Sequence, residues 1–368
     1  MLTIADAGRL VTGGVDTHAE VHVAGVADQA GRVLGTREFP ATAEGYAAAL
    51  AWMRGHGDLV KVGVEGTGSY GAGLARYLAG QGVEVAEVMR PNRQARRRRG
   101  KSDTADAVAA ALAALNGEAS GTPKSGDGAV ESIRALQVAR RGAVKARTQA
   151  GNQLRDLIIT APQPLRDKLA ALPAAQRVKL AARFRPGDLT SPAEAAKAAM
   201  AAVARRHQAL TAEIAQLDTA LQALVEHAAP AGFLARTGVG TRVAATLLVT
   251  AGDNPARLRT EASFAALCGA SPVDASSGKQ LRHRLNRGGD RHANSALWTI
   301  AMTRLACDPR TKAYAARRTT EGKTKKEIIR CLKRYIARET YKALCRPQRP
   351  GMPSAPKIKQ HFSAQVLT

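Results

Sequence analysis

The order of strand-like and helical segments in residues 10–115 is the feature that most limits how this chain can fold. Residues 13–39 alternate apolar and polar side chains, as in "EVHVAGV" and "RVLGTREF", with the turn "DQAG" between them. This is the pattern of half-buried strands. After a helical stretch, the apolar segments "VKVGVEG" and "VEVAEV" flank a second helical stretch. Strands first in succession and then alternating with helices predict an α/β domain with a mixed sheet.

The rest of the chain is predicted to be all-α. A Gly/Ser/Pro-rich linker at 116–128 precedes helical patterns at 129–160 and 194–228, where residues such as Ala139, Ala143 and Ala150 repeat at heptad spacing. Pairing of these helices within one chain, or between subunits, would bury the repeats. "TGVGTRVAATLL" resembles a helix–hairpin–helix element. We expect an α/β domain at 10–115, a linker and coiled-coil region at 116–230, a mostly helical domain at 231–346 and a tail at 347–368.

The charge of the chain indicates a polyanionic partner. Lys and Arg number 55 and Asp and Glu 30, which gives a formal net charge of +25, and bound nucleic acid would offset this self-repulsion. Apolar runs such as 243–252 are too short to span a bilayer, so no membrane partner is expected. The start of the chain lacks a signal-peptide pattern, and the four cysteines lack metal-binding spacing, which favours a cytoplasmic location. Aromatic residues are only 4%, so charge and shape must provide most of the binding.

Four carboxylates in the predicted α/β domain are candidates for a metal site. Asp16 and Glu65 stand at strand ends, and Asp103 and Asp106 lie one helical turn apart, so one edge of the sheet can gather them. Clustered carboxylates repel one another unless a divalent cation offsets their charge, and hard oxygen ligands suit Mg²⁺ or Mn²⁺. The cationic segment "RPNRQARRRRGK" just before these aspartates would hold a phosphodiester beside the metal.

Each acid also has a simpler structural explanation. "SDTAD" is a good helix start, with Ser102 or Asp103 as the N-cap and acids in the first turn. Asp16 would serve as a strand-end turn residue, Glu65 as a loop acid, and His18 as an exposed strand residue. Only the full set of acids, in this order and strand context, favours the metal site.

A second candidate for chemistry is the serine of "SSGK". Ser277 precedes Gly278 and a run of basic residues that are potential phosphate clamps. Serine is a weak nucleophile unless a base or a nearby cation activates it, and "SSG" in a loop is more often a flexible turn. Spacing alone therefore does not identify Ser277 as catalytic.

Two sets of motifs resemble one family of proteins. "GVDTHAEVHVAGV", "VGVEGTGSYG" and "KSDTADAVAAAL" resemble the three blocks of a RuvC-like, DEDD-type transposase domain. "TGVGTRVAATLLVTAGD" and "FAALCGASPVDASSGKQLRHRLNRGGDRHANSAL" resemble the C-terminal domain of the same proteins. These are the insertion-sequence transposases of family one-hundred-and-ten, also called bridge recombinases. The resemblance extends from about Gly13 to near Leu344, and the middle is its least diagnostic part.

The resemblance implies a RuvC/RNase H-like first domain and RNA-guided DNA recombination. A structured bridge RNA encoded by the element would pair with donor and target DNA, and homodimers would assemble into a tetramer. A bacterial, nucleoid-associated location follows from the same resemblance. The implied metal ligands are Asp16, Glu65, Asp103 and Asp106, and the implied nucleophile is Ser277, which would form a covalent phosphoserine link to DNA, with Ser276 as the second choice.

Basic residues in three segments are expected to contact nucleic acid. The first segment precedes Asp103, the second is the helical pattern between Ser132 and Arg155, and the third follows Ser277. The second segment contains six Arg or Lys residues and no acids. The expected contacts are Arg93, Arg96, Arg97, Arg98, Arg99, Lys101, Arg140, Arg141, Lys145, Lys279, Arg282, Arg284, Arg287 and Arg291.

Two other functions fit the same sequence. A metal-dependent nuclease of the RuvC or RNase H type, such as a junction resolvase, would use the same four carboxylates with water as the nucleophile. A non-enzymatic protein that packages RNA or DNA would need only the positive charge and the coiled coil.

Overall fold

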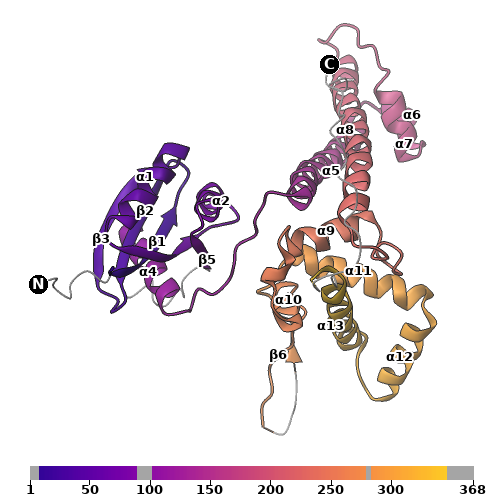
Figure 1. Cartoon of the computed structure of the whole chain (residues 1–368). Coiled ribbons are helices and arrows are strands. Elements are labelled where there is room, and N and C mark those ends of the chain that lie inside the picture. The colour runs from indigo at the N-terminus through magenta and orange to yellow at the C-terminus, as the bar shows by residue number, and fades with distance from the viewer. Residues whose placement is uncertain (1–7, 89–101, 279–282, 346–368) are drawn as a thin grey trace, which may run out of the picture.

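The computed structural model describes residues 8–88, 102–278 and 283–345. In Figure 1 a small sheet domain lies to one side, and an extended segment joins it to a helical remainder. In that remainder two long helices, α5 (Ala129–Thr160) and α8 (Pro192–Ala228), stand above the shorter helices of the C-terminal part. The predicted combination of an α/β region with a mostly helical remainder is confirmed.

The first region contains one mixed sheet with the strand order β3-β2-β1-β4-β5. The pairs β1–β2 and β2–β3 are antiparallel, and the pairs β1–β4 and β4–β5 are parallel. The strands predicted from alternation are present, and β4 ends at Glu65 as expected. Their bounds are β1 (Leu10–Thr17), β2 (Val21–Asp28), β3 (Val33–Pro40), β4 (Asp58–Glu65) and β5 (Glu84–Val88).

Alternation along the strands gives this sheet two different faces. On one face, Val15 and Val64 pack with Met53 in a core that includes residues of α1 (Ala43–Arg54) and α2 (Ala72–Gly80). On the other face, α4 (Asp103–Leu115) packs across β1, β2 and β4. Since residues two apart in a strand share a face, Gly14 and Asp16 lie on the side of α4, and Val15 lies on the opposite side.

Helix α4 approaches the sheet closely because glycines in the strands face alanines in the helix. A Cβ atom on Gly14 would lie 2.0 Å from the Ala111 nitrogen, and one on Gly63 would lie 2.4 Å from the Ala110 carbonyl oxygen. Ala110 and Ala111 are at most 1% exposed. Because glycine has no side chain, these positions allow the short distance between the helix and the strands.

The predicted linker is attached to both parts that it connects. The Glu87 nitrogen in β5 donates a hydrogen bond to the Gly121 carbonyl oxygen at 2.6 Å. Three residues later, Lys124 Nζ donates to the Val249 carbonyl oxygen of the C-terminal part at 2.5 Å. Few residues therefore separate the two points of attachment.

Helices α5 and α8 pack antiparallel within the one chain. Arg140 of α5 pairs with Asp218 of α8, and farther along α5 the side chain of Gln153 accepts a hydrogen bond from Arg206. The sequence left pairing within the chain or between subunits open, and the structure has the pairing within the chain. The two helices are connected through α6 (Gln163–Ala170) and α7 (Ala174–Ala181).

The C-terminal part is a set of helices with one small hairpin. Its core includes Phe233, Phe264 and Leu297 and continues into Leu221 of α8, so the proposed domain boundary at 230 falls inside one core. Within the described ranges, no helix is both long and apolar enough to cross a bilayer. The helix–hairpin–helix and RuvC-like resemblances stay predictions. The remaining elements are α9 (Thr241–Ala251), η1 (Pro255–Arg257), α10 (Glu261–Leu267), β6 (Val273–Asp274), β7 (His283–Arg284), α11 (Arg291–Cys307), α12 (Pro309–Thr320) and α13 (Lys325–Leu344).

Candidate active site

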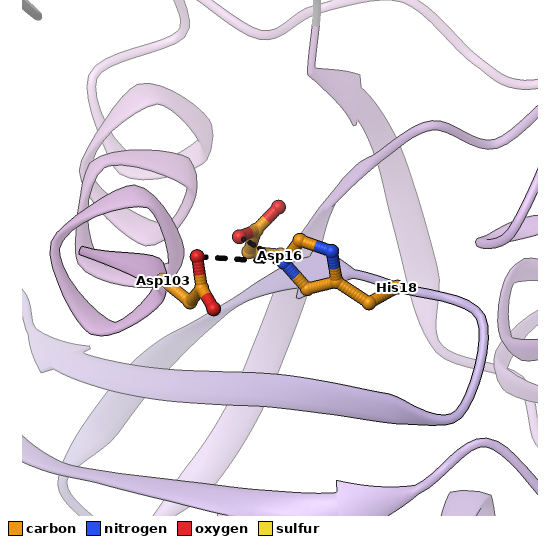
Figure 2. A group of neighbouring side chains, drawn as sticks. All are labelled: Asp16, His18 and Asp103. Carbon is orange, nitrogen blue, oxygen red and sulfur yellow. Dashed lines mark hydrogen bonds and ion pairs between the residues drawn. The ribbon is translucent and has the colours of Figure 1, made fainter. Parts of the chain in front are cut away.

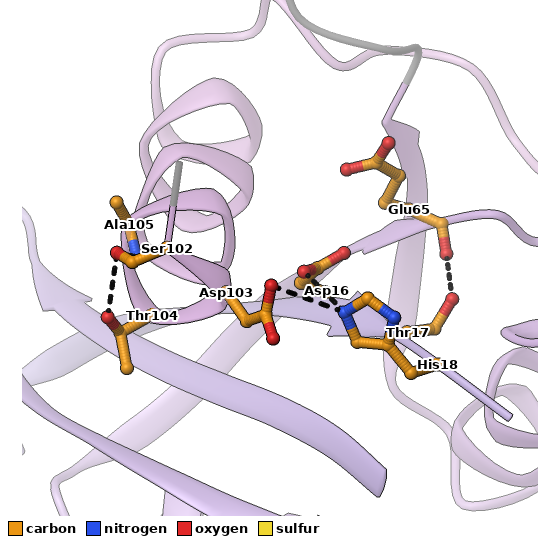
Figure 3. A network of polar contacts seen from close by, with 8 residues as sticks. All are labelled: Asp16, Thr17, His18, Glu65, Ser102, Asp103, Thr104 and Ala105. Carbon is orange, nitrogen blue, oxygen red and sulfur yellow. Dashed lines mark hydrogen bonds and ion pairs between the residues drawn. The ribbon is translucent and has the colours of Figure 1, made fainter. Parts of the chain in front are cut away.

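Two short motifs place two acids side by side at one edge of the sheet. β1 carries "GVD" at 14–16 and β4 carries "GVE" at 63–65. The two strands run parallel, with the glycines paired and the valines paired. In each motif the glycine faces α4, so the acid two residues later lies on that same face. Asp16 and Glu65 are therefore neighbours at the carboxyl ends of adjacent strands (Figure 3).

The third acid comes from the first residue of α4. Ser102 is the N-cap, because its hydroxyl accepts a hydrogen bond from the Ala105 nitrogen at 3.2 Å. The helix start therefore uses Ser102 as its cap and does not need the Asp103 carboxylate, which faces Asp16 (Figure 3). Asp106, one turn later in α4, is only 8% exposed. The structure thus brings Asp16 and Asp103 together and places Asp106 on the same helix end.

His18 lies between two of the acids, which the sequence did not predict. Its Nε2 is 3.1 Å from Asp16 Oδ2 and 3.5 Å from Asp103 Oδ1 (Figure 2). The His18 side chain is 47% exposed, as expected, but the residue follows the end of β1 and is not part of a strand. The available signal was the spacing in "DTH", which sets the histidine two residues beyond Asp16.

This group of donors fits a divalent cation. The ligand atoms of Asp16, His18 and Asp103 lie within 4.8 Å of one another, and Asp16 is 6% exposed. Close carboxylates of like charge are unfavourable unless a cation compensates them. Carboxylate oxygens suit Mg²⁺ or Mn²⁺, and an imidazole nitrogen is a common additional ligand. The arrangement supports a divalent metal, and which metal it is stays a prediction.

A tight turn after β4 fixes the position of Glu65. Gly66 has a φ of +69°, in the left-handed region that favours glycine, and the Gly71 nitrogen donates to its carbonyl oxygen at 3.0 Å. Thr17 Oγ1 donates to the Glu65 carbonyl oxygen at 2.8 Å. These bonds tie the ends of β1 and β4 together, so the backbone sets the spacing between Asp16 and Glu65.

Ser277 lies in a different part of the molecule from the acids. It is exposed in the segment that follows β6, in the hairpin formed with β7. This hairpin belongs to the helical remainder, whereas the acids belong to the sheet domain (Figure 1). Within one chain, the structure does not bring Ser277 to the carboxylates.

The two serines of "SSG" have different surroundings. The Ser276 hydroxyl donates to Asp274 Oδ1 at 2.5 Å, and the Ser276 nitrogen donates to the same oxygen at 2.9 Å. These hydrogen bonds hold the pKa of Asp274 below its usual range. Ser276 therefore stabilises the turn, whereas Ser277 is exposed at the next position.

The residues expected to contact nucleic acid occupy different environments. The Arg140 side chain is 15% exposed and pairs with Asp218, so it supports the α5–α8 contact. Arg141 and Lys145 are exposed on α5, and Arg284, Arg287 and Arg291 are exposed in the C-terminal part. The other expected contacts lie outside the described residues, as does the tail at 347–368; they are Arg93, Arg96, Arg97, Arg98, Arg99, Lys101, Lys279 and Arg282.

Comparisons with known proteins match both candidate segments. A family model described as "Transposase", for DEDD proteins of IS110 elements, matches residues 13–160. A second, described as "Transposase IS116/IS110/IS902 family", matches residues 233–316. The "Insertion element IS110 uncharacterized 43.6 kDa protein" of Streptomyces coelicolor is 33% identical over 115 residues, which are 31% of this chain. The match covers 28% of the length of that relative. The four candidate acids fall in the first matched segment and Ser277 falls in the second.

Proposed function

We propose that the chain is a transposase of the IS110 family, which cuts and rejoins DNA to insert and excise an insertion sequence, because two family models of such transposases match residues 13–160 and 233–316. In this proposal Asp16, Glu65, Asp103 and Asp106 bind Mg²⁺ or Mn²⁺, and the Ser277 hydroxyl is the nucleophile. A bridge RNA selects the donor and target DNA by base pairing. In this proposal the recombination takes place on the bacterial nucleoid, in the cytoplasm.

One observation carries the proposal: three separate elements converge on one edge of the sheet. The paired motifs at 14–16 and 63–65 supply Asp16 and Glu65, and the start of α4 supplies Asp103. Asp16 and Asp103 are close enough to share His18 as a contact. Such a convergence of acids from distant parts of the sequence supports metal-dependent phosphodiester chemistry over a set of unrelated turn and cap residues.

The proposed reaction has two transfers of the same phosphoryl group. Ser277 Oγ attacks a backbone phosphorus, and an Oγ–P bond forms while the bond from phosphorus to the leaving deoxyribose oxygen breaks. The serine loses its proton, and the leaving oxygen takes one up. A DNA hydroxyl then attacks the phosphoserine and reverses the exchange, so no ATP is consumed. A divalent cation, when bound, stabilises negative charge on the phosphate oxygens.

We propose that the reacting groups come from different subunits. Ser277 and the acids lie in separate parts of one chain, and a nucleophile must be within a few ångströms of the phosphate that it attacks. A dimer that assembles into a tetramer would place the hairpin of one subunit at the sheet edge of another. A composite site of this kind also limits cutting to complete assemblies.

RNA guidance is the part of the proposal that rests on charge and on the family resemblance. The net charge of +25 and the low aromatic content favour contacts with backbone and shape. Exposed Arg141 and Lys145 on α5 are suited to such contacts. A shift in the mobility of the bridge RNA with protein, weakened in an Arg141→Gln/Lys145→Gln variant, is the expected result.

A second candidate function is a metal-dependent nuclease in which water replaces the serine. The separation of Ser277 from the acids in one chain favours this alternative, because the sheet domain by itself contains a group of side chains that could bind a metal ion. The matches to two transposase family models support an enzyme over a non-enzymatic packaging protein.

Covalent attachment of DNA distinguishes a recombinase from a nuclease. The protein is incubated with bridge RNA, matching DNAs and Mg²⁺, and a protein–DNA adduct that survives denaturant is sought. Ser277→Ala should abolish the adduct, and the neighbouring Ser276→Ala should retain it as the matched control. Cutting that persists in Ser277→Ala would favour the nuclease. Strand exchange that persists in an Asp103→Asn/Asp106→Asn variant would refute the metal site.

Mixing two inactive variants tests the composite site. Ser277→Ala protein retains its acids, and Asp103→Asn protein retains its serine. If the serine and the acids act across subunits, a mixture of the two should recover part of the adduct that each has lost. If both groups act within one subunit, mixing should recover none.

A further inference from the structure

A cavity of about 370 Å³ lies at the base of the hairpin that carries Ser277. Arg284 and Leu285, at and just after β7, form one wall. The opposite wall is one side of α13, between Glu327 and Arg338. Since β7 pairs with β6 and Ser277 follows β6 by three residues, the cavity lies next to the strands that position the candidate nucleophile.

The lining of this cavity is strongly basic. Among the described residues that line it, six are Arg or Lys and one, Glu327, is acidic. Arg330, Arg334 and Arg338 are spaced four residues apart on α13, so their like charges share one side of the helix. Glu261 of α10 lies 2.6 Å from Arg334 and 2.9 Å from Arg338. Two acids against six cations leave a net positive site that favours an anion.

A buried lysine in the lining also favours binding of an anion in this cavity. Lys333 is 5% exposed, and its Nζ donates to Asn294 Oδ1 at 2.9 Å. Asn294 is oriented by its own Nδ2, which donates to the carbonyl oxygens of Cys268 and Gly269 at 2.9 and 3.0 Å. Burial, and then the nearby Arg330, lower the pKa of Lys333. An ammonium group has three donors, and a buried cation is most stable beside a negative partner.

An aromatic ring completes the site. Ile328 and Ile336 of α13 are buried, at 4% and 3% exposed. Tyr335 is instead 47% exposed and lines the cavity, with the Arg338 guanidinium 6.0 Å from its ring centroid. Cations that track phosphates beside a ring that stacks on bases are the usual combination for single-stranded nucleic acid.

We infer that this cavity binds one nucleotide of the DNA strand that is presented to Ser277. Its phosphate contacts Arg284, Arg330 and Lys333, and its base packs against Tyr335. The volume lies in the range of about 300–1,000 Å³ that is typical of small-molecule pockets. The inference rests on the proposed function for the identity of the strand. The cavity residues are positioning residues, because they hold the strand and do not touch the reacting bond.

Binding of a short, fluorescent, single-stranded oligodeoxynucleotide to the full-length protein tests the inference. An Arg284→Gln/Arg330→Gln variant should bind about tenfold more weakly, and its salt slope should fall by up to roughly 0.7, the value for one phosphate of a single strand, because both arginines contact the same phosphate. Lys325→Gln/Lys342→Gln removes the same charge outside the cavity lining and should change both quantities much less. Tyr335→Ala should also bind about tenfold more weakly but keep the wild-type salt slope.

A photochemical readout locates the base directly. An oligonucleotide that contains 5-iodouracil should crosslink to Tyr335 on irradiation, as mapped by mass spectrometry. Circular dichroism of each variant shows whether it is folded. If binding, salt slope and crosslink are the same in all folded cavity variants while the Ser277 adduct forms, the inference is overturned and the proposed function stands. If no adduct forms but binding still depends on Arg330 and Tyr335, the proposed function fails and the nucleotide site stands.

Discussion

Replacing Gly14 by alanine should move α4 away from the sheet and weaken metal binding without changing any acid. The new Cβ atom would lie 2.0 Å from the Ala111 nitrogen and 2.4 Å from the Ala107 carbonyl oxygen. Since Cβ atoms essentially never approach other atoms within 3.0 Å, the helix must retreat by about 1 Å. Both obstructing atoms belong to the backbone, so no side-chain rotation relieves the overlap. Such overpacking costs about 1–3 kcal/mol of stability.

Movement of α4 away from the sheet should change the geometry of the metal site, because α4 carries two of the acids. Asp106 directly precedes Ala107, and Asp103 lies about one turn before it. Mg²⁺ requires oxygen ligands at about 2.0–2.1 Å in near-octahedral geometry, and a shift of about 1 Å can cost roughly 100-fold in a catalysed rate. We therefore expect the Mn²⁺ affinity to fall by roughly 10-fold or more, in the range seen when groups that orient metal ligands are lost.

A graded series of glycine variants separates this effect from a general loss of stability. A Cβ on Gly80 meets nothing within 4 Å, and one on Gly25 would lie 3.3 Å from the Val108 nitrogen. Mn²⁺ affinity by electron paramagnetic resonance should decrease from Gly80→Ala to Gly25→Ala to Gly14→Ala, with urea unfolding as the stability control. Wild-type Mn²⁺ affinity and stability in Gly14→Ala would refute the reasoning. If Gly14→Ala does not fold, the Mn²⁺ affinities of Gly25→Ala and Gly80→Ala are compared instead, and equal affinities would refute the reasoning.

Three further perturbations test other parts of the structure. His18→Ala should lower Mn²⁺ affinity about 10-fold, and unchanged affinity would remove His18 from the site. Burial lowers the pKa of His22, so the unfolded chain takes up the proton first and stability falls as the pH drops below about 6.5. The difference in urea stability between His22→Phe and wild type should therefore shift in favour of the variant when the pH is lowered from 7.5 to 5. An equal difference at pH 7.5 and pH 5 would contradict this. Arg140→Gln should lower the free energy of unfolding by up to about 1 kcal/mol, because it removes the pair with Asp218. Arg141→Gln should instead flatten the salt dependence of RNA binding. The reverse pattern would refute a structural role for Arg140 and an RNA-binding role for Arg141.

The sheet was predictable because the information that specifies it is local. Alternation with a period of two and a turn segment indicates each strand before any partner is known. The helices were harder, since alanine suits both buried and exposed positions. Ala139 was expected in the seam of α5 and is exposed, while Gln137 is 8% exposed at the contact. Whether α5 pairs with α8 of the same chain depends on the connection through α6 and α7, which heptad spacing does not encode.

The candidate metal site was partly present in the sequence as a repeated motif. "GVD" and "GVE" each set an acid two residues after a glycine, and on parallel strands that spacing brings Asp16 and Glu65 onto the face that α4 covers. Order and residue type were enough to select these acids. His18 was missed because the spacing in "DTH" relates it to Asp16 alone, and its contact with Asp103 forms only on folding. The location of Ser277 relative to the acids could not be inferred, because it depends on how separate parts of the chain are arranged.

The linker bears on which subunit supplies the serine. Gly121 accepts a hydrogen bond from Glu87 in the sheet domain, and Lys124 donates to Val249 in the C-terminal part. Only two residues lie between these attachments, so the two parts of one chain cannot reorient widely without breaking them. A swing of the hairpin toward the acids of its own chain would have to break such bonds, whereas a second subunit can bring its hairpin to the sheet edge with the linker intact. The short tether therefore favours a serine supplied by another subunit, and the recovery of adduct by mixed variants follows from it.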